Sequence, residues 1–181
     1  DGLAWTITGT AMAKPAGCIY WGNYSVWNEG GSTWKMLVEA YNSTIWQTYY
    51  ATSANGLTWT LGNSGNPLTS LSVGGMYGGP SVSIIGGAYQ NWYHASTSGN
   101  TPTDIYRAHS TDAVNWTVVT PSPILTHLGS AYEIDQIADP NVLEIGGSSF
   151  MWYDADGGGT DIAAIKLATF AGTLAQLVAG T

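Results

Sequence analysis

Short runs of alternating apolar and polar residues, each ended by glycines, are the dominant pattern of the chain. In the C-terminal third, residues 142–145, 149–153 and 162–168 form three such runs. Gly146 and Gly147 close the first run, and Asp156 with three following glycines closes the second. Runs of this length and punctuation predict a meander of antiparallel strands joined by tight turns.

The same pattern occurs earlier in the chain, in residues 80–95 and 104–108. Three pairs of corresponding residues are each 60 positions apart: Pro80 and Pro140, Trp92 and Trp152, and Ala108 and Ala168. A repeat of this length indicates propeller blades or an array of similar units. We therefore predict an all-β protein, a β-propeller built of four-stranded antiparallel blades, with about three blades present.

A short turn followed by tryptophan is the second repeated feature. It reads DGLAWT at residues 1–6, NGLTWT at 55–60 and DAVNWT at 112–117. The Asp or Asn side chain can accept a hydrogen bond from its own backbone two residues on. The tryptophan offers a large flat face for packing between sheets. We predict that Trp5, Trp59 and Trp116 are largely buried and serve packing more than ligand stacking.

These repeats divide the chain, as one propeller domain or a fragment of one, into blades at about residues 15–70, 71–125 and 126–181. Residues 1–14 are then the outer strand of a preceding blade. The inner strands are predicted to begin near Ser25, Ser81 and Asn141. Residues 174–178 are predicted as the fourth strand of the last blade, with Gln176 in the tryptophan position, so that no helix is expected.

Composition narrows the possible partners. Only 9% of the 181 residues are charged, and the net charge is -8. The four Lys and Arg residues lie far apart, whereas nucleic-acid binding needs them clustered, so we set nucleic acid aside. No apolar run approaches the roughly 20 residues of a membrane helix, so membrane insertion is not expected. The single cysteine, Cys18, excludes an internal disulfide framework and is predicted to be a buried structural thiol.

No signal peptide is visible at the start of the sequence. The chain begins at Asp1 rather than Met, so we expect it to be processed, excised, or incomplete at its start.

Several segments resemble the five-bladed β-propeller glycoside hydrolases, the arabinanase, xylosidase, invertase and mannoside-phosphorylase relatives. The segments are DPNV at 139–142, FMWY at 150–153, IKLAT at 165–169 and ATSANGLTW at 51–59. The resemblance implies a propeller fold over almost the whole chain. Only three complete blades fit, which would leave two apolar sheet faces bare. We therefore expect an oligomer, or part of a larger chain, in which a neighbouring protein subunit covers these faces.

In the resembling enzymes the catalytic acids lie on the innermost strands and point at the central axis, because glycoside hydrolysis needs two carboxyl groups facing one pocket. Asp139 corresponds to that position, whereas the aligned blades offer Gly79 and Asn23. Glu133 and Asp135, in the preceding loop, are further catalytic candidates. A second row of aligned positions holds Glu39, His94 and Asp154. The candidate ligand-binding residues are Asn23, Glu39, His94, Trp92, Trp152 and Asp154. The alternative role for Asp139 is a turn or cap residue before Pro140.

No metal or other cofactor is predicted. His94, His109 and His127 form no close pair in the sequence, so a zinc site is poorly supported. The acidic, glycine-rich run at residues 154–161 lacks the residue order of a calcium loop and is predicted to be a solvated hairpin turn.

Two functional classes remain, and a third is kept open. The first is a non-catalytic propeller module for glycan recognition or assembly, as in an adhesin, a surface coat or a virion appendage. Sugar binding needs aromatic platforms and neutral hydrogen-bonding groups, and the chain is rich in both. Such a module is expected to be extracellular, at a surface or associated with a virion. The second is a glycoside hydrolase, or a fragment of one, acting on polysaccharide. The third is a pure scaffold. The sequence favours the first.

Overall fold

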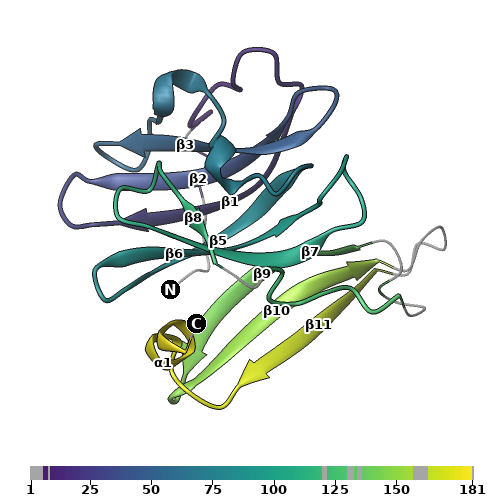
Figure 1. Ribbon diagram of the computed structural model, residues 1–181. Coiled ribbons are helices and arrows are strands. Elements are labelled where there is room, and N and C mark those ends of the chain that lie inside the picture. Colours follow the sequence, from purple (N-terminus) through teal and green to yellow (C-terminus); the bar gives the residue numbers. More distant parts are fainter. Residues whose placement is uncertain are drawn as a thin grey trace.

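Three antiparallel sheets, stacked one beside the next, make up the computed structural model of the chain (Figure 1). The structure describes residues 6, 7, 9–119, 122–129, 133, 136–156 and 163–180. The stacked sheets confirm the predicted all-β class and the blade-like repeat. No helix in this part of the chain is long and apolar enough to cross a membrane.

Each sheet is a meander in which strands follow one another in sequence order. The first contains β1 (Tyr20–Asn28), β2 (Trp34–Tyr41), β3 (Trp46–Ser53) and β4 (Thr60–Leu61). The second contains β5 (Tyr77–Ile85), β6 (Ala88–Ala95), β7 (Asp104–Ser110) and β8 (Thr117–Val118). The third contains β9 (Gln136–Ile145), β10 (Ser148–Asp156) and β11 (Ala163–Phe170). Two short 3-10 turns, Asn63–Gly65 and Thr69–Leu71, lie between the first and second sheets in the sequence.

The first strands of the three sheets, β1, β5 and β9, contact one another in that order. Ser25 Oγ on β1 accepts a hydrogen bond from Val82 N on β5 at 3.0 Å, and Ser81 Oγ on β5 accepts one from Val142 N on β9 at 3.1 Å. The repeated bond aligns Ser25, Ser81 and Asn141, as the sequence predicts. The strands begin four to five residues before these positions, because a bulge near the start of each strand leaves the preceding residues still paired.

The turns before Trp59 and Trp116 are formed as predicted. Asn55 Oδ1 and Asp112 Oδ1 each accept hydrogen bonds from the backbone two and three residues on. Each indole N–H then donates within its own turn, to Gly56 O at 3.1 Å and Ala113 O at 3.0 Å. Trp116 is 5% exposed, whereas Trp59 is only partly buried. The predicted burial is thus confirmed for Trp116 and confirmed in part for Trp59, which packs against the core beside the first sheet; Trp5 lies outside the described residues.

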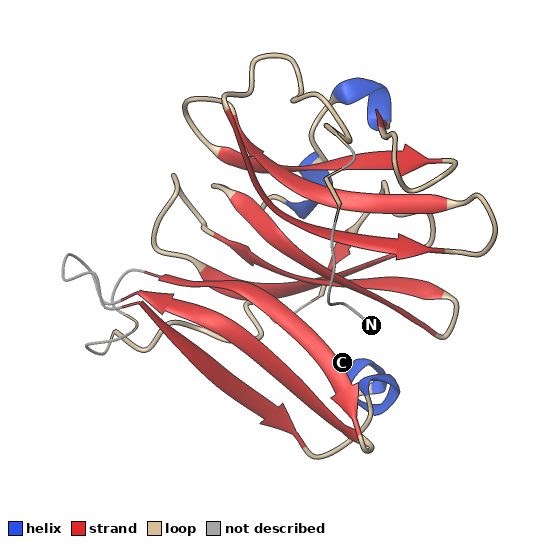
Figure 2. Cartoon of the chain, turned by 180° about the vertical axis from the view of Figure 1, so that it is seen from behind, coloured by secondary structure: helices blue, strands red, loops and turns tan. Residues whose placement is uncertain are grey.

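Within the described residues the third sheet has three strands and no fourth, which corrects the prediction for the end of the chain. Residues Leu174–Ala179 form a helix, α1, beside the end of this sheet (Figure 2). Gly172 stands where the second blade has Asp112, so the side chain that orders the turn is absent. Thr173 and Gln176 form a capping box instead, which favours a helix start at this point.

Apolar cores fill the two spaces between successive sheets. Leu37, Tyr50, Tyr93 and Trp116 pack between the first and second sheets, and Ile105, Ile137 and Tyr153 between the second and third. The far face of the first sheet is also covered, by a segment that contains Met12 and Cys18. Cys18 is buried, as predicted. Among residues 6, 7 and 9–14 the predicted outer strand is not formed.

The far face of the third sheet remains open to solvent. Cross-strand pairs place Phe150 beside Leu143, and Trp152 beside Leu167, on this face. The Phe150 and Trp152 rings stack with centroids 5.8 Å apart. Leu143 is 50% exposed and Leu167 is 52% exposed. Contiguous exposed apolar surface of this kind is unusual for an isolated domain.

Candidate functional site

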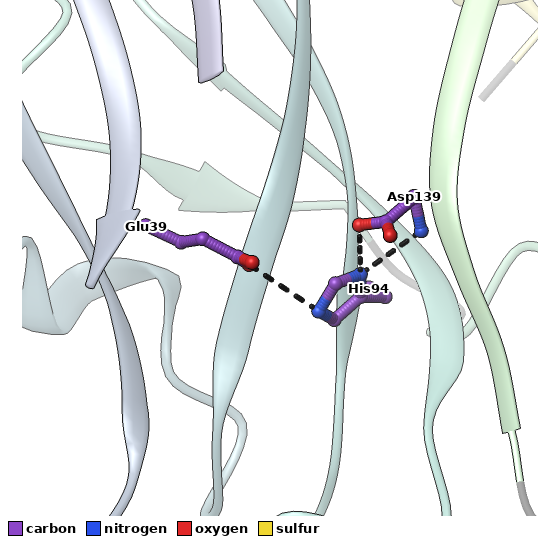
Figure 3. A group of neighbouring side chains, drawn as sticks. All are labelled: Glu39, His94 and Asp139. Atoms are coloured by element: carbon purple, nitrogen blue, oxygen red, sulfur yellow. Dashed lines mark hydrogen bonds and ion pairs between the residues drawn. The ribbon is translucent and has the colours of Figure 1, made fainter. Parts of the chain in front are cut away.

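Three polar side chains, one from each sheet, meet near the start of the inner strands (Figure 3). They are Glu39 on β2, His94 on β6 and Asp139 on β9. His94 lies between the two carboxylates: its Nε2 is 3.6 Å from Glu39 Oε2, and its Nδ1 is 3.3 Å from Asp139 Oδ1. Glu39 is 6% exposed and His94 is 5% exposed, whereas the side chain of Asp139 is 31% exposed.

Glycines on the inner strands give the Glu39 side chain its space. A Cβ atom at Gly22 would lie 1.9 Å from Glu39 Oε1, and one at Gly78 would lie 1.8 Å from Glu39 Oε2. A Cβ atom at Gly79 would lie 2.5 Å from both Asp139 Oδ1 and His94 Nδ1. Because these glycines have no side chains, the inner strands β1 and β5 leave a space between the first and second sheets. A carboxylate on β2 can contact an imidazole on β6.

The backbone of Asp139 is held in the left-handed region, with φ of +50°. Asp139 lies in the bulge of β9, directly before Pro140. Asp139 N donates a hydrogen bond to His94 Nδ1 at 3.0 Å, which fixes the strained conformation. Strained backbone of this kind is concentrated at functional sites, where neighbouring contacts hold it. The contact with His94 shows that Asp139 is more than a turn residue before proline.

A cavity of about 270 Å³ lies over the exposed side of Asp139. Residues from all three sheets line it: Asn23, Tyr24, Gly79, Pro80, Asp139, Pro140, Asn141 and Asp154. Asp139 and Asp154 are the two carboxyl groups among them. Glu39 and His94 lie behind this lining, on the buried side of Asp139.

The two carboxyl groups of the cavity differ in their environments. Burial raises the pKa of Asp139, but hydrogen bonds from His94 and Asn23 and the charge of His94 outweigh it, so that the pKa lies below its usual value. Burial raises the pKa of Asp154, and the nearby charge of Asp139 raises it further. At neutral pH Asp139 is therefore ionised, and Asp154 holds its proton more strongly than an exposed aspartate does.

Behind the cavity, burial and the charge of Asp139 raise the pKa of Glu39 above its usual value, against the opposing effect of His94. Burial lowers the pKa of His94, but the hydrogen bond with Asp139 and the surrounding carboxylates outweigh it and raise the pKa overall. The imidazole is thus more readily protonated than an exposed histidine.

The ligand atoms of Glu39, His94 and Asp139 lie within 4.8 Å of one another, a spacing that a metal ion could bridge. The sequence, read from the spacing of histidines alone, predicted no such group. Gly79 N and Asp139 N already donate to Glu39 Oε2 and His94 Nδ1. Because the Nδ1 lone pair of His94 already accepts from Asp139 N and is not available to a cation, we interpret the group as a hydrogen-bonded cluster.

The structure brings five of the predicted site residues together: Asn23, Glu39, His94, Asp139 and Asp154. Three others do not join them. Trp92 is 1% exposed and packs in the core with Val142 and Leu174. Trp152 lies on the open face of the third sheet, stacked on Phe150. Glu133 is buried and accepts hydrogen bonds from Leu128 N and Tyr153 OH.

These three placements have simple causes. Trp92 and Trp152 lie two residues before His94 and Asp154, on the same faces of the same strands, and therefore farther from the strand ends where the cavity lies. Glu133 is held by its own loop and by Tyr153. Asp135, and residues 157–161 of the predicted hairpin turn, lie outside the described residues.

Sequence reasoning missed four lining residues and two of the glycines. The lining residues are Tyr24, Pro80, Pro140 and Asn141. The glycines are Gly22 and Gly78, whose importance depends on the Glu39 side chain beside them. Glycine at the same place in two successive inner strands is the signal that could have found them. It marks a close approach of another group to the backbone.

Solved structures with a similar fold are glycoside hydrolases. One, described as a glycoside hydrolase, has a TM-score of 0.66 and 19% identity over 85% of this chain. A thermostable family-43 glycoside hydrolase gives 0.60 and 17% over 85%. A sucrose-6-phosphate hydrolase from Lactobacillus gasseri gives 0.63 and 13% over 83%. At these identities the similarity establishes the fold: this chain has the propeller fold of the five-bladed glycoside hydrolases of families 43 and 32.

The chain spans 46%, 52% and 32% of the lengths of these three structures, in the order given. Its three sheets correspond to part of their propellers. No protein-family model and no curated protein sequence matches the chain.

Proposed function

We propose that the chain carries the reacting part of a glycoside hydrolase site, with Asp139 and Asp154 as its two carboxyl groups. The observation that supports this most strongly is that both line one cavity at the start of the inner strands. Hydrolysis of a glycosidic bond needs two carboxyl groups facing one pocket. The glycoside hydrolase fold of the similar structures adds to the case. The sequence alone favoured a non-catalytic module, because the aligned inner-strand positions offered no second acid.

The environments of the two groups assign their roles. Ionised Asp139 suits a general base or nucleophile, and Asp154, with its raised pKa, suits the general acid. Such a pair divides acid and base work because its environments push the two pKa values apart. Asp154 lies on β10, the second strand of its sheet. It pairs with Ala138 and lines the cavity beside the bulge of β9 that contains Asp139.

The rest of the lining suits a neutral sugar. Asn23 and Asn141 offer amide donors and acceptors, and Tyr24 is 68% exposed and offers an aromatic face. Carbohydrates are bound by hydrogen bonds to their hydroxyl groups and by aromatic rings against their apolar faces. The substrate class that we propose is therefore a neutral polysaccharide or oligosaccharide. An extracellular or surface location, where such polymers occur, is part of the proposal.

A second candidate function is a non-catalytic module for glycan recognition or assembly. Two observations favour it: Asn23 and Gly79 stand where Asp139 stands in the third sheet, and the far face of the third sheet is open. In this alternative another protein subunit or a further blade covers Phe150, Trp152 and Leu167. The cavity would then hold a glycan without cleaving it.

The deciding experiment is hydrolysis of arabinosides, xylosides, fructosides and mannosides by the wild type, Asp139→Asn and Asp154→Asn. We expect turnover that both substitutions reduce by a factor of about 10² or more, as for loss of a general acid or base. Asp104→Asn, whose carboxylate pairs with His127 away from the cavity, is the control and should retain activity. Glycan binding without turnover, abolished by Asn23→Ala, would overturn the proposal in favour of the non-catalytic module.

A further inference from the structure

Glu39 is a buried carboxylate beside the cavity, 6% exposed, and neither proposed reacting carboxyl group explains it. Its side chain begins on β2, the second strand of the first sheet, and ends among the backbones of β1 and β5. The position exists only because Gly22 and Gly78 have no side chain. A glutamate in so little space needs specific partners, since an isolated buried carboxylate is strongly unfavourable.

Both carboxylate oxygens of Glu39 have backbone partners. Oε1 accepts from Asn23 N at 3.2 Å, and Oε2 accepts from Gly79 N at 2.6 Å. Asn23 belongs to the first sheet and Gly79 to the second, so the carboxylate is fixed from two sheets. The remaining neighbour is His94, whose Nε2 lies 3.6 Å from Oε2. The fixed carboxylate therefore presents negative charge to one side of the imidazole.

The other ring nitrogen of His94 faces two groups of Asp139. Nδ1 is 3.0 Å from Asp139 N and 3.3 Å from Asp139 Oδ1. In a neutral ring whose proton is on Nε2, the Nδ1 lone pair accepts from the backbone N–H. Asp139 Oδ1, which is buried, then has no hydrogen-bond partner. In a protonated ring, Nδ1–H donates to Oδ1 instead. One proton thus decides whether Asp139 Oδ1 has a hydrogen-bond partner.

We propose that Glu39 is a positioning residue for Asp139 and acts through His94. By holding the proton of the neutral ring at Nε2, it leaves the Nδ1 lone pair to accept the hydrogen bond from Asp139 N. Naming Asp139 as the reacting carboxylate rests on the proposed function, but the arrangement of the three side chains does not. The neutral ring leaves the Asp139 carboxylate available for reaction, and the protonated ring holds it in an ion pair.

The charged groups that face His94 come from the first and third sheets. Glu39 lies on β2, Asp139 on β9 and Asp154 on β10, and all three raise the pKa of the imidazole. Removing the charge of Glu39 or Asp139 should therefore lower it. Removing the charge of Glu39 should also weaken the preference for the proton on Nε2 in the neutral ring, because only Glu39 faces that atom as a charged group in the described residues.

The test is nitrogen-15 NMR of the histidine rings as a function of pH, with His94→Gln used to assign the His94 signals. In the wild type we expect a titration midpoint above the usual histidine value and a neutral ring protonated at Nε2. Glu39→Gln should shift the His94 midpoint downward and reduce the Nε2-protonated fraction. Asp104→Asn is the matched control, because Asp104 Oδ1 lies 2.7 Å from His127 Nδ1. It should change only the His127 signals.

An unchanged His94 midpoint and tautomer in Glu39→Gln would overturn the proposal. If Glu39→Gln does not fold, the wild-type tautomer and the midpoint of Asp139→Asn still test it: a ring protonated at Nδ1 in the neutral form, or no downward shift in Asp139→Asn, would refute it. The NMR result is independent of hydrolysis. A chain without turnover but with the expected NMR behaviour would refute the proposed function alone.

Discussion

Two polar clusters join the first and second sheets at opposite ends of their strands. At one end, Lys35 on β2 pairs with Glu29 at 2.9 Å and donates to Tyr89 OH on β6 at 2.7 Å. At the other end, Glu39 on β2 faces His94 on β6, with Asp139 of the third sheet beyond. The same two strands carry both clusters.

The clusters differ in whether their charges balance. Lys35 and Glu29 are one cation and one anion, and Tyr89 OH also donates to Glu29. Hydrogen bonds with Tyr89 and the mutual attraction outweigh burial, so that the pKa of Glu29 is lowered and that of Lys35 is raised. His94, by contrast, is shared by two carboxylates, and apart from this ion pair Asp139 Oδ1 has no hydrogen-bond partner among the described residues. A balanced pair suits a structural contact. An unbalanced and buried one is typical of a reacting site.

The first prediction concerns the cluster of Lys35, Glu29 and Tyr89. We expect aromatic packing to stabilise this end of the strands more than the ion pair does. Tyr89 packs against Trp116 with ring centroids 6.5 Å apart. Trp116→Ala should lower the free energy of unfolding by about 3–5 kcal/mol, as for other large-to-small core substitutions. Partly buried Trp59 is the control, and Trp59→Ala should cost less, about 1–2 kcal/mol. Equal costs in denaturant titrations would contradict the difference in burial.

The second prediction compares the two glutamates. Glu39→Ala leaves Gly79 N and Asn23 N without their carboxylate acceptor and should cost about 2–4 kcal/mol. Glu29 is partly exposed, and Glu29→Ala should cost about 1 kcal/mol or less. Chemical denaturation of both variants measures the contrast. If Glu29→Ala proved the more costly, the buried carboxylate would not be the stronger contact.

The third prediction concerns the glycine that makes room for Glu39. A Cβ atom at Gly78 would lie 1.8 Å from Glu39 Oε2, so Gly78→Ala must displace that side chain and should cost about 1–3 kcal/mol. Gly180→Ala is the control, because its nearest new contact would be 3.7 Å away. In the double variant with Glu39→Ala, the cost of Gly78→Ala should shrink. Thermal unfolding that shows full additivity would refute the steric explanation.

The smallest expected effect is the pH dependence of stability. The pKa of His94 is raised from its ordinary 6.5, so its contribution is fully present below about 6.5 and is lost as pH rises through the folded-state value. The raised pKa of Glu39 acts in the same direction. The contributions of Glu29 and Lys35 stay constant between their ordinary values of 4.5 and 10.5.

Melting temperatures measured from about pH 6 to about pH 9 should therefore fall in the wild type. His94→Gln should flatten this fall, and Glu29→Gln should leave it unchanged. A wild-type profile that rises over this range would contradict the direction of the His94 shift.

The sequence by itself determined the repeating part of this protein. Glycine turns, alternating runs and constant spacing predicted the all-β class, the meander of each sheet and the alignment of Ser25 with Ser81. Each of these features depends on neighbouring residues or on one constant spacing along the chain. Each can therefore be predicted without knowing which sheet faces pack together. The repeat, extended to the end of the chain, predicts a strand at residues 174–178. The capping box at Thr173 and Gln176 favours a helix there instead.

Only the tertiary structure decided the site. Glu39, His94 and Asp139 lie in three sheets and come together because Gly22 and Gly78 leave a space between second strands and the neighbouring blade. The sequence aligned Glu39 with His94 and Asp154, but it did not show that side chains on these second strands reach the neighbourhood of Asp139. It also gave Trp92 a ligand role that its burial in the core excludes. Which side chains share a cavity depends on the small gaps and bulges between stacked sheets, and the spacing of residues along the chain does not record these.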